Sequence, residues 1–229
     1  MTVFTRRPVV TLDGPAGAGK TSTAKEVARR LGLRHLDSGA LYRALTFALR
    51  QKDIPEARWP ELAADDFRAL GVSLLRTERG FEVRVGARAL DEELRTTEVT
   101  GRVSQLAGLP AVRACLLELQ RTAGEQGGLV ADGRDMGTVV FPDAEVKVFL
   151  VADLHERARR RILQAGSGPA SGETLAAEAE AIALRDDRDA GRDISPLRRP
   201  EGAVEIDTTA LSFDEQVDAI VGLVRQLTL

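Results

Sequence analysis

Residues 14–21 read GPAGAGKT, and this stretch decides the fold of the chain. It follows a short apolar run, Val9 to Leu12, and precedes a segment whose apolar residues recur at helical spacing. A glycine-rich turn between a strand and a helix forms a phosphate-binding loop, because its backbone N–H groups and the helix N-terminus attract phosphate oxygens. Lys20 would then reach the β- and γ-phosphates, and the Thr21 hydroxyl would ligate Mg²⁺. The motif predicts that this chain binds a nucleoside triphosphate.

The predicted contacts to that triphosphate are the residues of the loop and the residue that follows it. They are Gly14, Pro15, Ala16, Gly17, Ala18, Gly19, Lys20, Thr21 and Ser22, and Thr21 is the predicted metal ligand. Lys20 is also predicted to be catalytic, since phosphoryl transfer depends on positive charge held close to the transferred group. Mg²⁺ is the cofactor that this chemistry implies.

Four short apolar runs predict buried strands, and helical patterns separate most of them. This alternation is typical of an α/β fold in which a parallel sheet is flanked by helices. The predicted strands are Val9 to Leu12, Leu129 to Ala131, Val146 to Val151, and Val204 to Ile206. A capping box, Ser212-x-x-Glu215, predicts where the last helix begins.

The chain between the first two predicted strands is too long for a single crossover. Within it, residues 72–75 and 81–85 flank a turn, and the second run alternates apolar with polar side chains. We therefore expect a single domain over residues 1–229, with an inserted subdomain at about residues 43–112 that contains a small antiparallel sheet.

A glycine-rich stretch, GSGPASG at residues 166–172, lies between arginine-rich helical patterns. It has two interpretations that the residues do not separate. One is an ordinary surface loop, and the other is the tip of a mobile lid formed by about residues 157–190.

Composition narrows the range of partners. The formal net charge of −3 disfavours a general nucleic-acid binder, and no apolar run approaches the length of a membrane span. The N-terminal segment lacks the apolar stretch of a signal peptide, and the single cysteine, Cys115, lies in an apolar run typical of a core. We expect a cytoplasmic protein that acts as a monomer, without nucleic-acid or membrane partners.

Three charged clusters could hold the second reactant of a phosphoryl transfer, and the first is DSGALYR at residues 37–43. Ser38 could cap the helix that begins after it and leave free N–H donors for an anion. Arg43 falls a turn further along. On spacing alone, an arginine of a solvated helix face is an equally open interpretation.

The second cluster, DGRDMG at residues 132–137, follows the strand predicted at Leu129 to Ala131. Loops at the carboxyl ends of parallel strands form the ligand sites of such sheets. Asp132 lies where a carboxylate that supports a bound magnesium is expected. Arg134 and Asp135 would project into the crevice.

The third cluster is RDDRD at residues 185–189, followed by Arg192. At helical spacing, Arg185, Arg188 and Arg192 share one side, and Asp189 lies a turn from Arg185. A charge run of this kind is usually a solvated helix face, so its role depends on the wider set of motifs.

Taken together, these motifs resemble those of the bacterial cytidylate kinases, and the resemblance runs nearly from end to end. The stretches that carry it are LDGPAGAGKT, LDSGALYR, SQLAGLPAVR (residues 104–113), ADGRDMGTVVFPDA and RDDRD. The phosphate-binding loop is common to many nucleotide-binding proteins, whereas DSGALYR and DGRDMGTVVFPDA are specific in combination. The resemblance implies a P-loop kinase that transfers the γ-phosphoryl group of Mg-ATP to CMP or dCMP, in pyrimidine nucleotide metabolism.

The resemblance also implies roles for particular residues. Those implied for the acceptor phosphate are Ser38, Arg43 and Arg134, and those for the base are Ser104, Arg113 and Asp135. Those implied near the sugar and phosphate are Arg185 and Asp189. The closing lid would contribute Arg188 and Arg192, which completes a catalytic set of Lys20, Arg134, Arg188 and Arg192. Further possible lid donors are Arg157 and Arg161, and the departures from the family pattern are Ala181 and Leu184.

The alternatives differ in what they require of the chain. A phosphate acceptor is already anionic, so no strong general base is needed, and His35 and His155 are interpreted as structural. Other P-loop kinases, acting on UMP, AMP or a small metabolite such as shikimate, remain open. A regulatory GTPase would need an Asn-Lys-x-Asp motif, which a chain without asparagine cannot contain. A non-catalytic ATP-binding module also remains open, although Lys20 and the arginines weigh against it.

Overall fold

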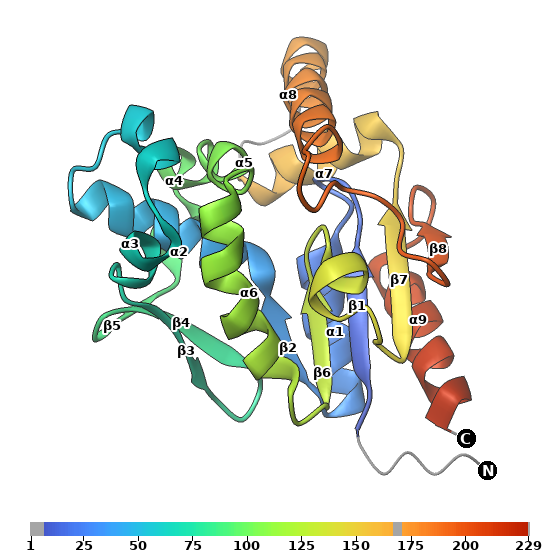
Figure 1. The fold of residues 1–229 in the computed structure, drawn as a ribbon. Helices are drawn as coiled ribbons and strands as arrows, with labels where there is room; N and C mark the ends of the chain where they lie inside the picture. Colours follow the sequence, from blue (N-terminus) through green and yellow to red (C-terminus); the bar gives the residue numbers. More distant parts are fainter. Residues whose placement is uncertain (1–6, 167–170, 229) are drawn as a thin grey trace.

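A five-stranded parallel sheet forms the centre of the molecule (Figure 1). The computed structural model describes residues 7–166 and 171–228. The strand order is β2-β6-β1-β7-β8, and each neighbouring pair is parallel. The strands are β1 (Val9–Asp13), β2 (Arg34–Asp37), β6 (Leu129–Asp132), β7 (Val146–Val151) and β8 (Val204–Asp207).

The four predicted strands are confirmed, and each ends within one residue of its expected end. β2 was not predicted, because its sequence, RHLD, has one aliphatic residue, Leu36. β2 forms at the edge of the sheet, where its one ladder is with β6 and Leu36 is buried in an apolar cluster. Because this strand buries one aliphatic side chain, its sequence contains no hydrophobic run by which it could be predicted.

Alternate residues of β1 face two different helical layers, as the pleat of a strand requires. Val10 packs in one apolar cluster with Val27 of α1 and Ile220 of α9. Val9 packs on the opposite face, in a cluster that includes Ala123 of α6. The helices of these layers are α1 (Lys20–Leu31), α6 (Pro110–Gly124) and α9 (Phe213–Thr228).

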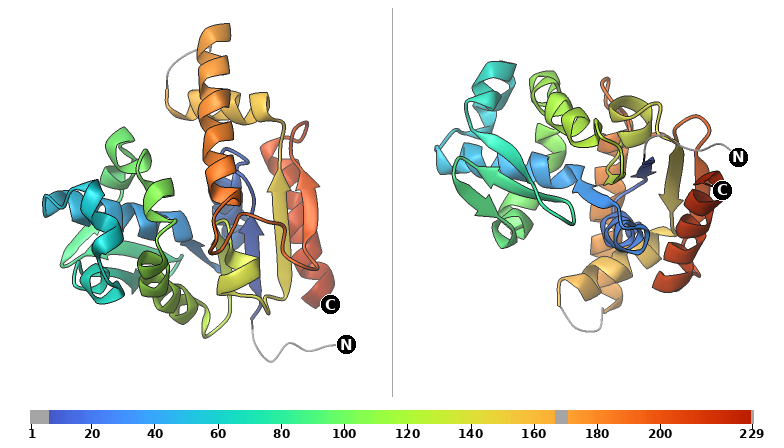
Figure 2. Two further views of the ribbon diagram at one scale, coloured as in Figure 1. Left: turned by 45° about the horizontal axis from the view of Figure 1, so that its top comes forward. Right: turned by 90° about the horizontal axis from the view of Figure 1, so that it is seen from below.

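A second, smaller sheet lies beside the main one and has its own apolar core (Figure 2). β4 pairs antiparallel with β3 and β5, so the predicted hairpin is confirmed. β5 was not predicted, because it has three residues and two of them are exposed. The core around this sheet includes Leu41, Leu45, Trp59 and Phe67. The elements are β3 (Val72–Arg76), β4 (Phe81–Val85), β5 (Arg88–Leu90), α2 (Ser38–Gln51), α3 (Ala64–Arg68), α4 (Thr97–Thr100), α5 (Val103–Leu106), η1 (Glu56–Glu61) and η2 (Glu92–Arg95).

Two packed helices, α7 (Leu154–Gln164) and α8 (Gly172–Ala190), lie beyond the carboxyl ends of the main strands (Figures 1 and 2). The candidate lid loop joins them, and its residues 167–170 lie outside the described residues. No helix in the described part of the chain is long and apolar enough to cross a membrane.

The two predicted helix caps have different outcomes. The capping box at the last helix is confirmed, since Ser212 Oγ accepts from Glu215 N and Glu215 Oε2 accepts from Ser212 N. The prediction that Ser38 caps α2 is wrong. Asp37 is the N-cap, and its carboxylate accepts the Ala40 N–H at 3.0 Å. Ser38 becomes the first helical residue because the charged acceptor stands one position earlier.

Candidate active site

The phosphate-binding loop joins β1 to α1, and its glycines adopt backbone conformations that favour glycine. Gly14 and Gly19 have φ angles of 146° and 83°, and a Cβ atom on Gly14 would lie 2.1 Å from the carbonyl oxygen of Leu150. α1 begins at Lys20, whose buried Nζ donates to the carbonyl oxygen of Pro15 at 2.6 Å. The N–H groups of the helix N-terminus therefore face the loop and make it an anion site.

Positive charge is concentrated around Lys20. Burial lowers the pKa of Lys20 well below its ordinary value, and Arg134 lowers it further. Burial also lowers the pKa of Arg185 to about 10, and Arg134 again contributes. Lys20, Arg134 and Arg185 repel one another, and the negative charges of bound phosphates would stabilise all three.

Thr21 at the start of α1 lies beside Asp132 at the end of β6. Thr21 Oγ1 donates to Asp132 Oδ2 at 2.6 Å, and the other carboxylate oxygen of Asp132 lies 2.7 Å from His35 Nε2. Burial is the largest single influence and would raise the pKa of Asp132, but His35, Thr21 and Lys20 together lower it. An ionised carboxylate beside a hydroxyl fits Mg²⁺, which prefers hard oxygen donors and keeps ligands from water and nucleotide phosphates. No group of three histidine, cysteine or acidic side chains suited to a metal occurs in the described residues.

The acceptor side begins at the junction of β2 and α2. Ser38 is buried, and its Oγ accepts from Gln120 Nε2 at 2.9 Å. Arg43 forms an ion pair of 2.6 Å with Asp37. The Nε atoms of Arg43 and Arg185 are buried and lack a hydrogen-bond partner among the described residues. Buried donors of this kind are costly unless a ligand accepts from them, so this cluster suits an anion.

Asp189 of α8 connects three distant segments. Its carboxylate accepts from Ser104 Oγ and from Arg134 Nε, both at 3.0 Å, and it forms an ion pair of 3.3 Å with Arg192. Burial is the largest single influence and would raise the pKa of Asp189, but Arg134, Arg192, Arg185 and Ser104 together lower it. One carboxylate therefore holds the inserted segment, the loop after β6 and the end of α8 together.

Arg113 of α6 and Asp135 of the loop after β6 form a buried ion pair of 2.7 Å. Arg113 Nε also donates to the carbonyl oxygen of Ala107 at 2.7 Å. Its guanidinium lies 5.7 Å from the centre of the Tyr42 ring, and burial raises the pKa of Tyr42 to about 12. A carboxylate acceptor and a guanidinium donor in a dry setting can distinguish ligands by their hydrogen-bonding pattern.

A family model described as cytidylate kinase matches residues 10–226 of the chain. The chain belongs to the cytidylate kinase family. Membership relates the chain to proteins described as kinases of cytidylate.

Individual relatives agree with the family assignment. A cytidylate kinase from Chloroherpeton thalassium is 40% identical over 226 residues, which cover 96% of this chain and 94% of that protein. A bifunctional pantoate ligase/cytidylate kinase from Synechococcus sp. (strain RCC307) is 42% identical over 229 residues. The match covers 98% of this chain but spans only 44% of that longer relative. Among solved structures, an uncharacterized protein from Eubacterium ventriosum shares the fold, with a TM-score of 0.51, 11% identity, and coverage of 96% and 99% of the two chains.

In this cytidylate kinase family member, Arg192 joins the acceptor cluster through Asp189, whereas the other predicted lid arginines do not. Arg188 is exposed on α8 and makes no hydrogen bond or ion pair with the described residues. Arg161 forms an ion pair of 2.8 Å with Glu178 of α8. Arg157 is buried and donates to the carbonyl oxygen of Ala16 at 2.9 Å, so it belongs to the phosphate-binding loop rather than to a free lid surface.

Sequence reasoning missed three residues that organise this kinase site. Asp186 accepts the Ala16 N–H at 2.8 Å and pairs with Arg157, so it ties α8 to the donor loop. Asp13 accepts the N–H groups of Met136 and Gly137, at 2.8 and 2.7 Å. Gln120, the third, holds Ser38. Asp13 and Asp186 lie within or beside recognised motifs, and this position could have identified them as site residues. Gln120 lies in the middle of a helix, and no motif marks it.

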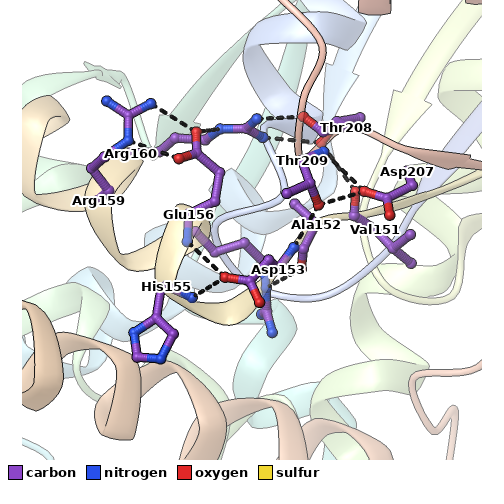
Figure 3. A network of polar contacts seen from close by, with 11 residues as sticks. Val151, Ala152, Asp153, His155, Glu156, Arg159, Arg160, Asp207, Thr208 and Thr209 are labelled. Carbon is purple, nitrogen blue, oxygen red and sulfur yellow. Dashed lines mark hydrogen bonds and ion pairs between the residues drawn. The ribbon is translucent and has the colours of Figure 1, made fainter.

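A polar network joins the first turn of α7 to the segment between β8 and α9 (Figure 3). Arg160 donates to the hydroxyl and carbonyl oxygens of Thr208, at 3.0 and 2.6 Å, and to Glu156 at 2.8 Å. Thr208 in turn donates from its hydroxyl to the carbonyl oxygen of Val151 at 3.0 Å. The network fixes the start of α7 relative to the ends of β7 and β8, and so fixes where Arg157 reaches the loop.

Proposed function

We propose that this chain transfers the γ-phosphoryl group of Mg-ATP to CMP or dCMP, with residues 14–22 as the donor site and the cluster opposite as the acceptor site. The observation that carries the proposal is the buried Arg113–Asp135 pair, whose charges act on Arg192, the arginine that pairs with Asp189. A base-reading pair beside an anion cluster suits a nucleoside monophosphate better than a neutral metabolite.

The donor half would position the triphosphate through the loop backbone and Lys20. Mg²⁺, when bound, would neutralise charge on the β- and γ-phosphates, and Thr21 and Asp132 are the residues that would hold it. Lys20 is buried at the helix N-terminus and would stabilise the charge that develops on the transferred group. Arg157 and Asp186 hold the loop at Ala16 and would keep it in the phosphate-binding shape.

The acceptor half would hold the monophosphate through Ser38, Arg43, Arg134 and Arg185. The attacking oxygen is already anionic, so the residues here orient and neutralise rather than remove a proton. The buried Nε atoms of Arg43 and Arg185 would donate to the phosphate, which explains why they face no protein acceptor in the described chain. Asp189 would orient Arg134 and Arg192 and contact the sugar, and Ser104, which donates to Asp189, would contact the base.

Selection of cytosine would rest on Asp135 and Arg113. Asp135 would accept from the exocyclic amine, and Arg113 would donate to the ring acceptors. Uracil presents a carbonyl in place of that amine, so two acceptors would face each other in a buried site. A mispaired buried group of this kind supports strong rejection of UMP.

The moving parts would be the insertion at about residues 43–112 and the lid at about residues 157–190, with Arg161, Arg188 and Arg192 as its cations. Closure would exclude water and so protect ATP from hydrolysis. We also propose that the kinase acts as a monomer in the cytoplasm, without nucleic-acid or membrane partners.

The deciding experiment is a coupled assay of ADP formation with CMP, dCMP, UMP, AMP and shikimate. CMP or dCMP should have the highest kcat/KM, and ADP formation should depend on the acceptor. Asp135→Ala should reduce discrimination between CMP and UMP and leave the KM for ATP unchanged. Fastest turnover with UMP, AMP or shikimate would overturn the proposal.

A further inference from the structure

We propose that His35 is a positioning residue for the metal side of the donor site, where it holds the Asp132 carboxylate in the orientation that Mg²⁺ requires. The inference deepens the proposed function and rests on its donor half, though not on the identity of the acceptor. It changes the role expected for His35 from general support of the fold to a specific one in metal binding.

The first observation is that both oxygens of Asp132 are held. His35 Nε2 lies 2.7 Å from Oδ1, and Thr21 Oγ1 donates to Oδ2 at 2.6 Å. Asp132 is buried, and its carboxylate accepts from both partners, with His35 Nε2 as the donor of the first contact. Rotation of the carboxylate would break both bonds. His35 therefore determines which way the carboxylate faces beside the Thr21 hydroxyl.

The second observation is that His35 is itself held in place through its backbone. Its N–H donates to the carbonyl oxygen of Arg79, in the turn between β3 and β4, at 3.2 Å. Gly80 of that turn packs so closely that a Cβ atom there would lie 2.6 Å from the carbonyl oxygen of His35. The tip of the smaller sheet thus rests on β2 at the residue whose side chain orients Asp132.

The chemistry of the site explains why a donor is needed at this position. Asp132 is almost fully buried, so an oxygen without a hydrogen-bond partner would be costly and the carboxylate would turn toward another donor. Loss of a side chain that orients a metal-facing group weakens metal affinity or activity by about 10-fold to 100-fold. A merely structural histidine would instead affect stability and leave the metal dependence unchanged.

The test compares His35→Leu, His35→Gln and the wild-type chain by calorimetric titration of ADP, in EDTA and at increasing Mg²⁺. His35→Leu should raise the Mg²⁺ concentration needed for the metal-dependent gain in ADP affinity by about 10-fold. Its ADP affinity in EDTA should be unchanged. His35→Gln should be closer to wild type, because its amide N–H can still donate to Asp132. His155→Gln is the matched control, since His155 is exposed on α7, and it should match wild type.

The outcomes separate this inference from the proposed function. An unchanged Mg²⁺ requirement in His35→Leu would overturn the inference, even if the variant melts at a lower temperature. Equal losses of ADP affinity with and without Mg²⁺ would also overturn the inference, because they indicate a distorted phosphate-binding loop rather than a misplaced Asp132 carboxylate. Fastest turnover of wild type with an acceptor other than CMP or dCMP would overturn the proposed function and leave the metal result intact.

Discussion

Arg113 and Asp135 form an ion pair of 2.7 Å in which both side chains are less than a tenth exposed. The pair joins α6 to the loop after β6 across the proposed base site. A buried pair is destabilising to break, because the remaining charge has neither a partner nor water. The proposed recognition of cytosine and the stability of the kinase therefore depend on the same two side chains.

We expect Arg113→Met to destabilise the protein by about 3–5 kcal/mol, since it leaves the buried Asp135 carboxyl without its partner. The free energy of unfolding, measured in urea, checks this, and the KM for CMP should also rise. Arg58→Met is the matched control, because Arg58 and Glu61 pair on the exposed surface, where ion pairs contribute little. Equal effects of the two substitutions would contradict the prediction.

Asp186 links the lid helix α8 to the donor loop, and Asp186→Asn should weaken ATP binding. The variant loses the charged acceptor of the Ala16 N–H and the ion pair with Arg157. A lost hydrogen bond to a charged group corresponds to a rise of about 10-fold or more in the KM for ATP. The KM for CMP should change little. Asp187→Asn, which alters the exposed neighbour on the same helix, provides the control, and an equal rise in its KM for ATP would disprove the link.

Asp13 predicts a pH dependence of stability. Burial raises its pKa from 3.8 to about 7, against the effect of the Gly137 and Met136 N–H groups. Between these values the folded state retains a proton that the unfolded state releases. The stability contributed by Asp13 is therefore full below pH 3.8 and is lost as the pH rises to about 7. A shift of this size corresponds to about 4 kcal/mol.

The measurement is the difference in the free energy of unfolding between wild type and Asp13→Asn across that pH range. Asparagine does not titrate, so the advantage of wild type should decline steadily with rising pH. The comparison cancels the carboxylates with lowered pKa, such as Asp132 and Asp189, whose contributions have the opposite sign. A difference that stays constant with pH would show that Asp13 does not titrate in this range.

Local patterns predicted the parts of this protein that depend on local physics. The apolar runs of β1, β6, β7 and β8 marked buried strands, and Ser212 with Glu215 marked the start of α9. The same reasoning missed β2, whose partner β6 lies 95 residues further along, at Leu129 against Arg34. The sequence analysis also placed the N-cap of α2 at Ser38. Serine and aspartate are both good N-cap residues, and which of Asp37 and Ser38 caps the helix depends on where β2 ends.

By itself, the sequence determined the donor loop, the α/β fold and the family, because each depends on contiguous residues with strict backbone or periodic requirements. Only the tertiary structure decided which charges meet. Asp189 pairs with Ser104 and Arg134, Asp186 holds Ala16, and Arg188 stays exposed although it belongs to the same charge run. The physical reason is that the strength of an ion pair depends on the distance between the charges and on their burial. Spacing along one helix does not specify the distance or the burial of a pair formed between separate elements.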